Sequence, residues 1–186
     1  MERALVELAQ HGDEEAFASL VRMAGDRLMA VAFRILRDVT RAEDAVQQTI
    51  VTTWRELPTL RDPDRFGGWL YRMLVNACYA EARRTRRMTA AVTVISLDPQ
   101  RRQDGILSVD DRDELERAFR RLPAEQRAVF VLHHHVGMRL AEVAQTLDIP
   151  LGTVKSRLHY ATASMRAAIE ADARTPSSAL LEERPA

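Results

Sequence analysis

The spacing of hydrophobic residues predicts a pair of short helices between residues 139 and 166. A first apolar face has helical spacing and consists of Leu140, Val143, Ala144 and Leu147. Pro150 then interrupts the period, because proline disfavours helical backbone at the residue before it and suits a first helical turn. A second apolar face follows and consists of Val154, Leu158, Ala161 and Met165. Helices this short must pack on each other, so the pattern predicts a helix-turn-helix.

The second of these helices has an outer face rich in hydrogen-bonding groups. Its members are Thr153, Lys155, Ser156, Arg157, His159 and Tyr160. The N-terminal turns of a recognition helix reach base edges in the major groove, where Lys and Arg pair with guanine or phosphate and Ser bonds to either. The pattern therefore favours DNA binding. A solvated surface in an ordinary helical bundle is the alternative that this stretch alone leaves open.

Helical spacing also predicts helices over residues 2–36, 38–57 and 68–87, and two helices within 113–135 that are divided at Pro123. We expect Asp13 to cap a helix that begins at Glu14, and Thr40, with Glu43 three residues later, to cap the next one. Residues 58–69 contain two prolines and two glycines and predict a loop with fixed turns. Residues 88–112 show no sustained period and predict a linker.

The fold class that follows is all-α, with two small helical domains joined by a flexible linker. The domains cover residues 1–87 and 113–172, the linker covers 88–112, and residues 173–186 form a disordered tail. An aromatic content of 5% and only seven glycines agree with helices.

Cysteine usage and hydropathy limit where such a chain would work. Cys78 is the single cysteine, so no intrachain disulfide can form, and a reducing, cytoplasmic setting fits. For Cys78 itself, a buried structural role is favoured over oxidant sensing. The N-terminus lacks a secretion signal, and no apolar run approaches the roughly 20 residues that span a bilayer. We expect no membrane insertion.

The net charge of zero hides an uneven distribution. Residues 61–95 carry seven arginines and three acids, whereas residues 96–116 carry three arginines and seven acids. Arg83, Arg84, Arg86 and Arg87 would repel one another without an anion nearby, so they favour a nucleic-acid backbone contact. The aromatic residues Trp54, Phe66 and Trp69 either stack on unpaired bases or belong to the core, and both alternatives stay open.

The triplet His133-His134-His135 invites a metal site. Consecutive helical residues point in different directions and cannot grip one ion, so we expect no metal and no other cofactor. A metal-dependent enzyme built on this triplet, and a dimeric helix-turn-helix repressor, are the alternative functions. We expect no catalytic residue.

Four segments in order resemble the extracytoplasmic-function (ECF) sigma factors of the bacterial sigma-70 family. GDEEAFASLV (12–21) resembles the start of region 2, and DVTRAEDAVQQTIVTTW (38–54) is similar to a D-x-x-x-A-E-D-x-x-Q…W segment. FGGWLYRMLVNACYAEARR (66–84) is similar to F-x-x-W-L-x-x-x-x-x-N…R-R, and residues 122–158, which include GTVKSRL, resemble the whole of region 4.

The resemblance implies a role for each zone. It implies core RNA polymerase, with its β and β′ subunits, as a partner, and a surface that docks on the clamp helices of β′, formed by Asp38, Glu43, Asp44 and Gln47. Taken alone, this acidic helix start would be a solvated face. It implies contacts with the −10 promoter element from Leu60, Arg61, Phe66, Trp69, Arg72, Asn76, Arg83 and Arg84. It implies −35 contacts from the six polar-face residues named above, and control by an anti-sigma factor.

Three positions depart from the family pattern. Many relatives have Asp where this chain has Ala80, and Arg where it has Tyr160 and Thr162. These differences bear on the promoter sequence that is read and on the grip on phosphate, and leave the function class unchanged.

Overall fold

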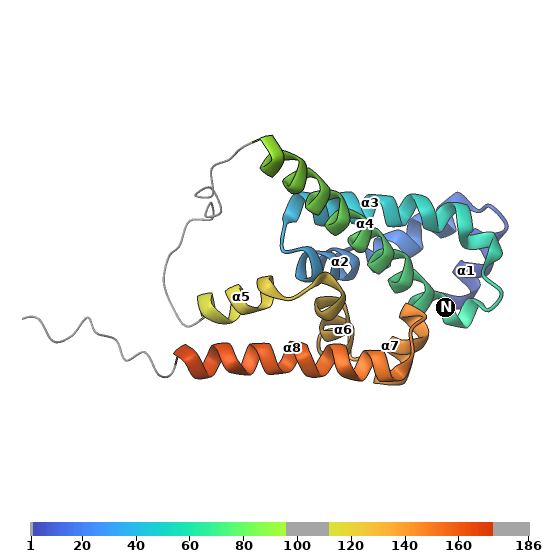
Figure 1. The fold of residues 1–186 in the computed structure, drawn as a ribbon. Helices are drawn as coiled ribbons and strands as arrows, with labels where there is room; N and C mark the ends of the chain where they lie inside the picture. The colour runs from blue at the N-terminus through green and yellow to red at the C-terminus, as the bar shows by residue number, and fades with distance from the viewer. Residues whose placement is uncertain (1, 96–111, 173–186) are drawn as a thin grey trace, which may run out of the picture.

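The computed structural model describes residues 2–95 and 112–172, and these residues form helices with no strand among them (Figure 1). The elements are α1 Glu2–Gln10, α2 Glu14–Leu36, α3 Val39–Glu56, η1 Leu57–Thr59, η2 Pro63–Arg65, α4 Phe66–Ile95, α5 Arg112–Arg121, α6 Ala124–His134, α7 Leu140–Leu147 and α8 Leu151–Asp172. The prediction of an all-α fold is confirmed. The predicted tail, and residues 96–111 of the predicted linker, lie outside the described residues.

Side-chain caps fix where the first long helices begin. The Asp13 carboxylate accepts a hydrogen bond from the backbone N–H of Ala16 at 2.9 Å, so α2 begins at Glu14 as predicted. The cap of α3 is Asp38, which accepts from the backbone N–H of Arg41 at 3.0 Å. The prediction of a cap at Thr40 was wrong, because Asp38, two residues earlier, supplies the acceptor and α3 begins at Val39.

Hydrogen bonds from α1 stabilise the connection between α3 and α4. Gln10 of α1 donates from its side-chain amide to the carbonyls of Leu57 and Leu60, at 3.1 and 2.6 Å. Two short 3-10 helices, each with a proline in its first turn, complete the predicted loop. Helix α4 then begins at Phe66 and continues to Ile95, eight residues beyond the predicted end at Arg87. The stretch after Arg87 has no glycine or proline before Pro99, so nothing local stops the helix there.

The helix-turn-helix forms as the apolar spacing predicts. Helix α7 ends at Leu147, and Asp148 takes the left-handed conformation (φ 53°) that turns the chain before Pro150 and α8. At the start of α7, the Glu142 carboxylate accepts from the backbone N–H of Arg139 at 2.7 Å. Val143 and Val154, one from each helix, are fully buried and form the small shared core.

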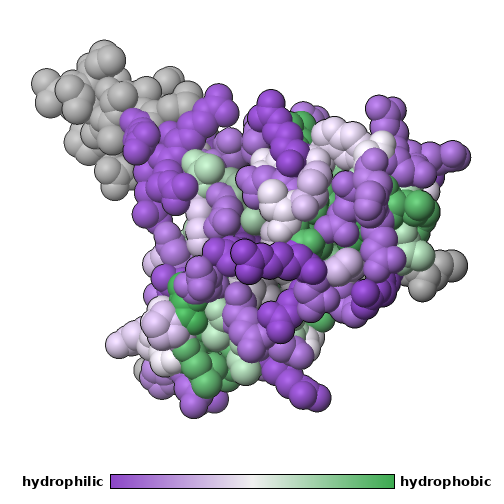
Figure 2. Space-filling view, turned by 90° about the vertical axis from the view of Figure 1, so that its right-hand side faces the viewer, coloured by the Kyte–Doolittle hydropathy of each residue, from purple (hydrophilic) through white to green (hydrophobic). Residues whose placement is uncertain are grey.

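The two halves, α1–α4 and α5–α8, lie against each other. Helix α2 contacts α6, and α4 contacts both α6 and α7. Ile35 and Leu74 of the first half belong to the same buried cluster as Leu132 and Val143 of the second. The two predicted helical halves are therefore present, joined by a packed contact that the sequence did not predict. The face of the molecule in Figure 2 is largely hydrophilic, with smaller separate hydrophobic areas.

Candidate nucleic-acid interface

Helix α8 presents the polar face that the sequence assigns to DNA. Val154 and Ala161 are fully buried and turn one side of the helix inward, which leaves Lys155, Ser156 and His159 exposed on the other. The Ser156 hydroxyl donates to the Thr153 carbonyl at 3.0 Å and can still accept. Among the described residues Lys155 has no ion-pair partner, so its ammonium group is available to an anion.

The third turn of α8 adds a large ring to this face. Tyr160 is 61% exposed, and its ring lies 5.8 Å from that of His159, centroid to centroid. Leu151, in the first turn, is also exposed at 41%. Arg157 differs from its neighbours in being half-buried, because it faces the first half of the molecule.

Helix α4 carries a second polar stripe. Arg72, Asn76, Tyr79 and Arg83 follow one another at spacings of four, three and four residues and so lie on one side of the helix. Asn76 and Arg83 are exposed. The sequence prediction missed Tyr79, although its spacing from Asn76 and Arg83 was visible.

Tyr79 is the covered member of this stripe. Its hydroxyl is buried and has no hydrogen-bond partner among the described residues. Burial raises the pKa of Tyr79 to about 12, while the nearby positive charge of Arg157 acts in the opposite direction. The phenol is therefore neutral at physiological pH and can act as a hydrogen-bond donor.

The basic cluster extends the stripe toward the end of α4. Arg83, Arg84, Arg86 and Arg87 are all exposed. A surface groove is lined by Arg83, Arg84 and Arg87, together with Ala80. Among the described residues, Arg84 forms an ion pair with Glu81 at 3.7 Å and the other arginines of the groove form none, so the groove keeps most of its positive charge. This arrangement suits the phosphate backbone of a nucleic acid.

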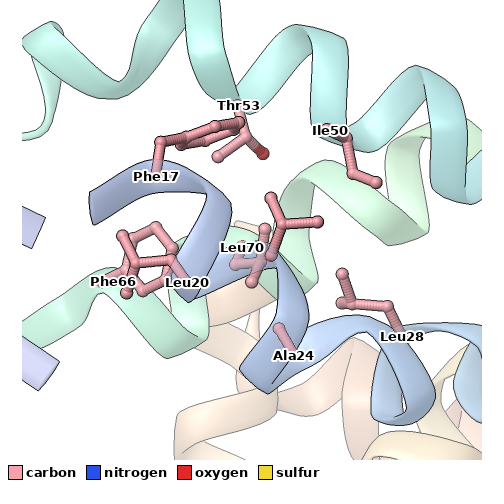
Figure 3. A pocket seen from close by; sticks show the side chains of 9 residues that line it. Phe17, Leu20, Ala24, Leu28, Ile50, Thr53, Phe66 and Leu70 are labelled. Carbon is pink, nitrogen blue, oxygen red and sulfur yellow. The ribbon is translucent and has the colours of Figure 1, made fainter. Parts of the chain in front are cut away.

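The loop residues divide into exposed and buried ones. Arg61 is exposed, Leu60 and Trp69 are partly buried, and Phe66 is only 3% exposed. Phe66 lines an apolar gap between α2, α3 and α4 together with Leu20 and Leu70 (Figure 3). Its ring is enclosed by core side chains in this arrangement, so its contact with promoter DNA stays a prediction that its burial does not support. The burial of Phe66 agrees with the alternative that assigns it to the core.

Helix α3 offers an acidic outer surface. Glu43, Asp44 and Gln47 are exposed, while Ala42 and Ala45 between them are fully buried. Asp38 is different, since its carboxylate caps the helix and also lies 3.4 Å from Arg41. Within the described structure Asp38 therefore stabilises the start of α3.

The surroundings of the histidine triplet and of Cys78 indicate a part in the packing of the protein. His133 donates from Nδ1 to the Met138 carbonyl at 2.8 Å, because a carbonyl can only accept. Within the described part of the chain no group of three acidic, histidine or cysteine side chains could hold a metal ion. Cys78 is buried, and burial raises the pKa of its thiol to about 12, so it is not a thiolate at neutral pH.

Comparison with known proteins decides the family. Residues 20–88 match the family model for Sigma-70 region 2, and residues 112–165 match that for Sigma-70 region 4. The ECF RNA polymerase sigma factor SigL of Mycobacterium tuberculosis (strain H37Rv) is 32% identical over 166 residues, covering 86% of this chain and 94% of SigL. The chain belongs to the ECF sigma factors of the sigma-70 family.

Further matches agree with this family. SigW of Bacillus subtilis (strain 168) is 26% identical, covering 87% of this chain and 92% of SigW. The solved structure of CnrH in complex with the cytosolic domain of CnrY has a TM-score of 0.65 at 29% identity, covering 92% of this chain and 98% of CnrH. The sigma factor RpoE of Bartonella quintana, solved with the anti-sigma factor NepR, shares the fold, with a TM-score of 0.65 at 22% identity.

The family match decides between the sigma factor and the repressor that the sequence left as an alternative. An ECF sigma factor directs RNA polymerase to promoters, and sigma factors bind RNA polymerase and promoter DNA. A dimeric repressor leaves the region 2 match over residues 20–88 unexplained. A search of the described residues finds no helix long and apolar enough to cross a membrane.

Proposed function

We propose that this sigma factor docks on core RNA polymerase through α3, captures melted −10 bases through α4 and reads −35 duplex through α8. The observation that carries the proposal is the pair of polar stripes on α4 and α8, one in the region 2 match and one in the region 4 match. The factor acts by binding alone, and the polymerase performs the chemistry of RNA synthesis.

The −35 element is read from the major groove by the exposed face of α8. Thr153, Lys155, Ser156, Arg157, His159 and Tyr160 form this face. Lysine and arginine donate to the O6 and N7 acceptors of guanine, and the serine hydroxyl bonds to a base edge or phosphate. Tyr160 and Thr162 stand where many relatives have arginine, so this helix holds fewer cations for phosphate at its third and fourth turns.

The −10 element is captured after the duplex melts. Asn76 offers an amide that can donate to and accept from the Watson–Crick edge of a flipped base. Leu60, Arg61 and Trp69 lie at the start of this surface, and Arg72, Arg83 and Arg84 bind the backbone beside it. Binding energy at these groups offsets the few kcal/mol that unstacking a base costs.

Docking on the polymerase uses the exposed side of α3. Glu43 and Asp44 carry negative charge and Gln47 adds an amide, a composition that suits a basic surface on the clamp of the β′ subunit. Region 4 contacts the β subunit. Because polymerase is the partner, we place the protein in the cytoplasm.

A protein inhibitor is a further expected partner. The CnrH structure holds the cytosolic domain of CnrY, and the RpoE structure holds an anti-sigma factor. The similarity of this chain to CnrH supports control by an anti-sigma factor of its own.

Holoenzyme binding to forked promoter DNA tests the assignment of surfaces. Core polymerase reconstituted with Asn76→Ala is expected to lose affinity for a fork with an unpaired −10 strand, and to keep affinity for −35 duplex. The matched variant Lys155→Ala is expected to show the reverse. Asp44→Arg is expected to reduce co-elution with core before any DNA is added. Equal losses on both DNA probes for Asn76→Ala and Lys155→Ala would contradict the division of labour.

A further inference from the structure

Helix α1 lies beside the connection between α3 and α4, which carries part of the proposed −10 surface (Figure 1). Leu60 and Arg61, two of the residues assigned to the −10 element, lie in this connection between η1 and η2. The backbone there is neither helix nor strand, so it keeps one conformation only where other parts of the protein hold it. The contacts of this loop with α1 therefore bear on how the −10 element is read.

One side-chain amide connects α1 to the loop. Gln10, the last residue of α1, donates from Nε2 to the carbonyl oxygens of Leu57 and Leu60, at 3.1 and 2.6 Å. Carbonyl oxygens only accept, so the nitrogen end of the amide faces them and both of its N–H groups are used. The Leu60 carbonyl belongs to the peptide bond that leads into Arg61, so this amide fixes the backbone at the point where the loop presents Arg61.

The packing of α1 holds Gln10 in place. Val6 is fully buried and Ala9 nearly so, which anchors the last two turns of α1 in the core. Directly after Gln10 the chain reverses at Gly12, which takes the left-handed conformation (φ 92°), and Asp13 then caps α2. Because the backbone is fixed on both sides of Gln10, its amide is a rigid donor for the loop.

A second contact between α1 and the connection is an exposed ion pair. Arg3 donates from Nη1 to Oδ2 of Asp64 at 2.6 Å and from Nε to Oε1 of Glu7 at 2.8 Å. The side chains of Arg3 and Asp64 are both more than half exposed, so solvent screens their attraction. The part-buried hydrogen bonds of Gln10 are therefore the stronger constraint on the loop.

A loop that is fixed before DNA binds has two consequences for recognition. It loses less conformational entropy when it contacts an unpaired base, so binding is tighter. It also presents Leu60 and Arg61 in one arrangement, which suits some bases and rejects others, whereas a loose loop can adapt to each base and discriminates less.

We propose that Gln10 is a positioning residue for −10 recognition, which fixes the loop that presents Leu60 and Arg61 and so determines how strictly the −10 sequence is read. Gln10 acts through these two residues. This inference rests on the proposed role of the loop in −10 capture. It adds a specificity determinant that precedes the match to Sigma-70 region 2, which begins at residue 20.

An isosteric variant of the full-length protein tests the proposal. Gln10→Glu keeps the size of the side chain and places a carboxylate, which only accepts, opposite the carbonyls of Leu57 and Leu60. The probe is a fork with an unpaired −10 strand, taken from a promoter that the unsubstituted holoenzyme transcribes, with each of the four bases at each unpaired position. Holoenzyme with Gln10→Glu should bind the best fork about threefold to tenfold more weakly, and its preference for the best base should fall by a similar factor.

Two further variants show whether the N–H donors are responsible. Arg3→Gln is the matched control, because it changes the charge of α1 by the same amount and leaves the Gln10 amide in place. It should keep both the affinity and the base preference. Gln10→Lys returns N–H donors to the position and should recover the preference. A preference as weak in Gln10→Lys as in Gln10→Glu would show that the donors do not position the loop.

The base preference separates positioning from a loss of folded protein. A smaller folded fraction lowers binding to every fork by the same factor and leaves the ratios between bases unchanged. Gln10→Glu should change these ratios while co-elution with core and affinity for −35 duplex stay the same. An unchanged preference, or an equal loss on all bases, would overturn the role of Gln10 and leave the proposed function standing. If the unsubstituted holoenzyme itself shows no preference at any unpaired −10 position, the proposed capture of −10 bases fails, and this inference fails with it.

Discussion

Replacing Asp38 by alanine is expected to weaken the fold while leaving polymerase docking intact. Its carboxylate accepts from the backbone N–H of Arg41 at 3.0 Å and caps α3. Loss of such a cap costs about 1 kcal/mol. The ion pair with the Arg41 side chain, at 3.4 Å and more than a third exposed at both ends, adds only a few tenths of a kcal/mol. For a domain of this size, the sum corresponds to a fall in melting temperature of about 2–4 °C.

Urea unfolding followed by circular dichroism, together with co-elution with core polymerase, measures the two effects separately. Asp38→Ser restores a capping hydroxyl and should keep the free energy of unfolding within a few tenths of a kcal/mol of the unsubstituted protein. Asp44→Ala is the matched control, because this exposed carboxylate on the same helix is assigned to docking and should change binding but not stability. If Asp38→Ser keeps stability but loses core binding, Asp38 is a docking contact and the reasoning from the cap fails.

Three further predictions concern the recognition helix, the cysteine and the core. Lys155→Ala and Arg157→Ala should each weaken −35 duplex binding by holoenzyme by about 1–3 kcal/mol if they contact bases, and a loss equal on all sequences would show phosphate contacts only. Cys78 should resist alkylation at pH 8 in the native protein and react in urea. Burial raises the pKa of its thiol from 9.0 to about 12, so the stability that the neutral thiol contributes should be constant below pH 9 and be lost as the pH rises toward 12. Unfolding at a series of pH values measures this loss. Leu132→Ala, at a fully buried position, should lower the free energy of unfolding by about 2–5 kcal/mol, and a loss below 1 kcal/mol would contradict its place in the core.

Local pattern was sufficient for most of the helices. The apolar spacing and Pro150 predicted the helix-turn-helix, and Asp13 predicted the start of α2, because each depends on residues within one or two turns. The cap at Asp38 was missed since Thr40 is an equally plausible acceptor nearby. The length of α4 was missed because the residues after Arg87 lack amphipathic spacing, although nothing among them ends a helix.

Contacts between distant residues were beyond prediction from one sequence. Arg72 and Asp148 are 76 residues apart, and no local period links them. The burial of Phe66 was one of two open alternatives, because an aromatic residue after a loop suits either a base or a core. Tyr79 could have been found from its spacing to Asn76, but its cover comes from the other half of the chain.

Transcription by core polymerase reconstituted with this protein tests the central claim most directly. RNA 5′ ends would be mapped on genomic DNA of the source organism, with core alone, with the protein, and with its Asp44→Arg variant. We predict a set of starts that requires the protein, shares −35 and −10 sequences, and is lost in the variant. No protein-dependent start, together with no co-elution of the protein with core, would contradict the claim that this chain acts as a sigma factor.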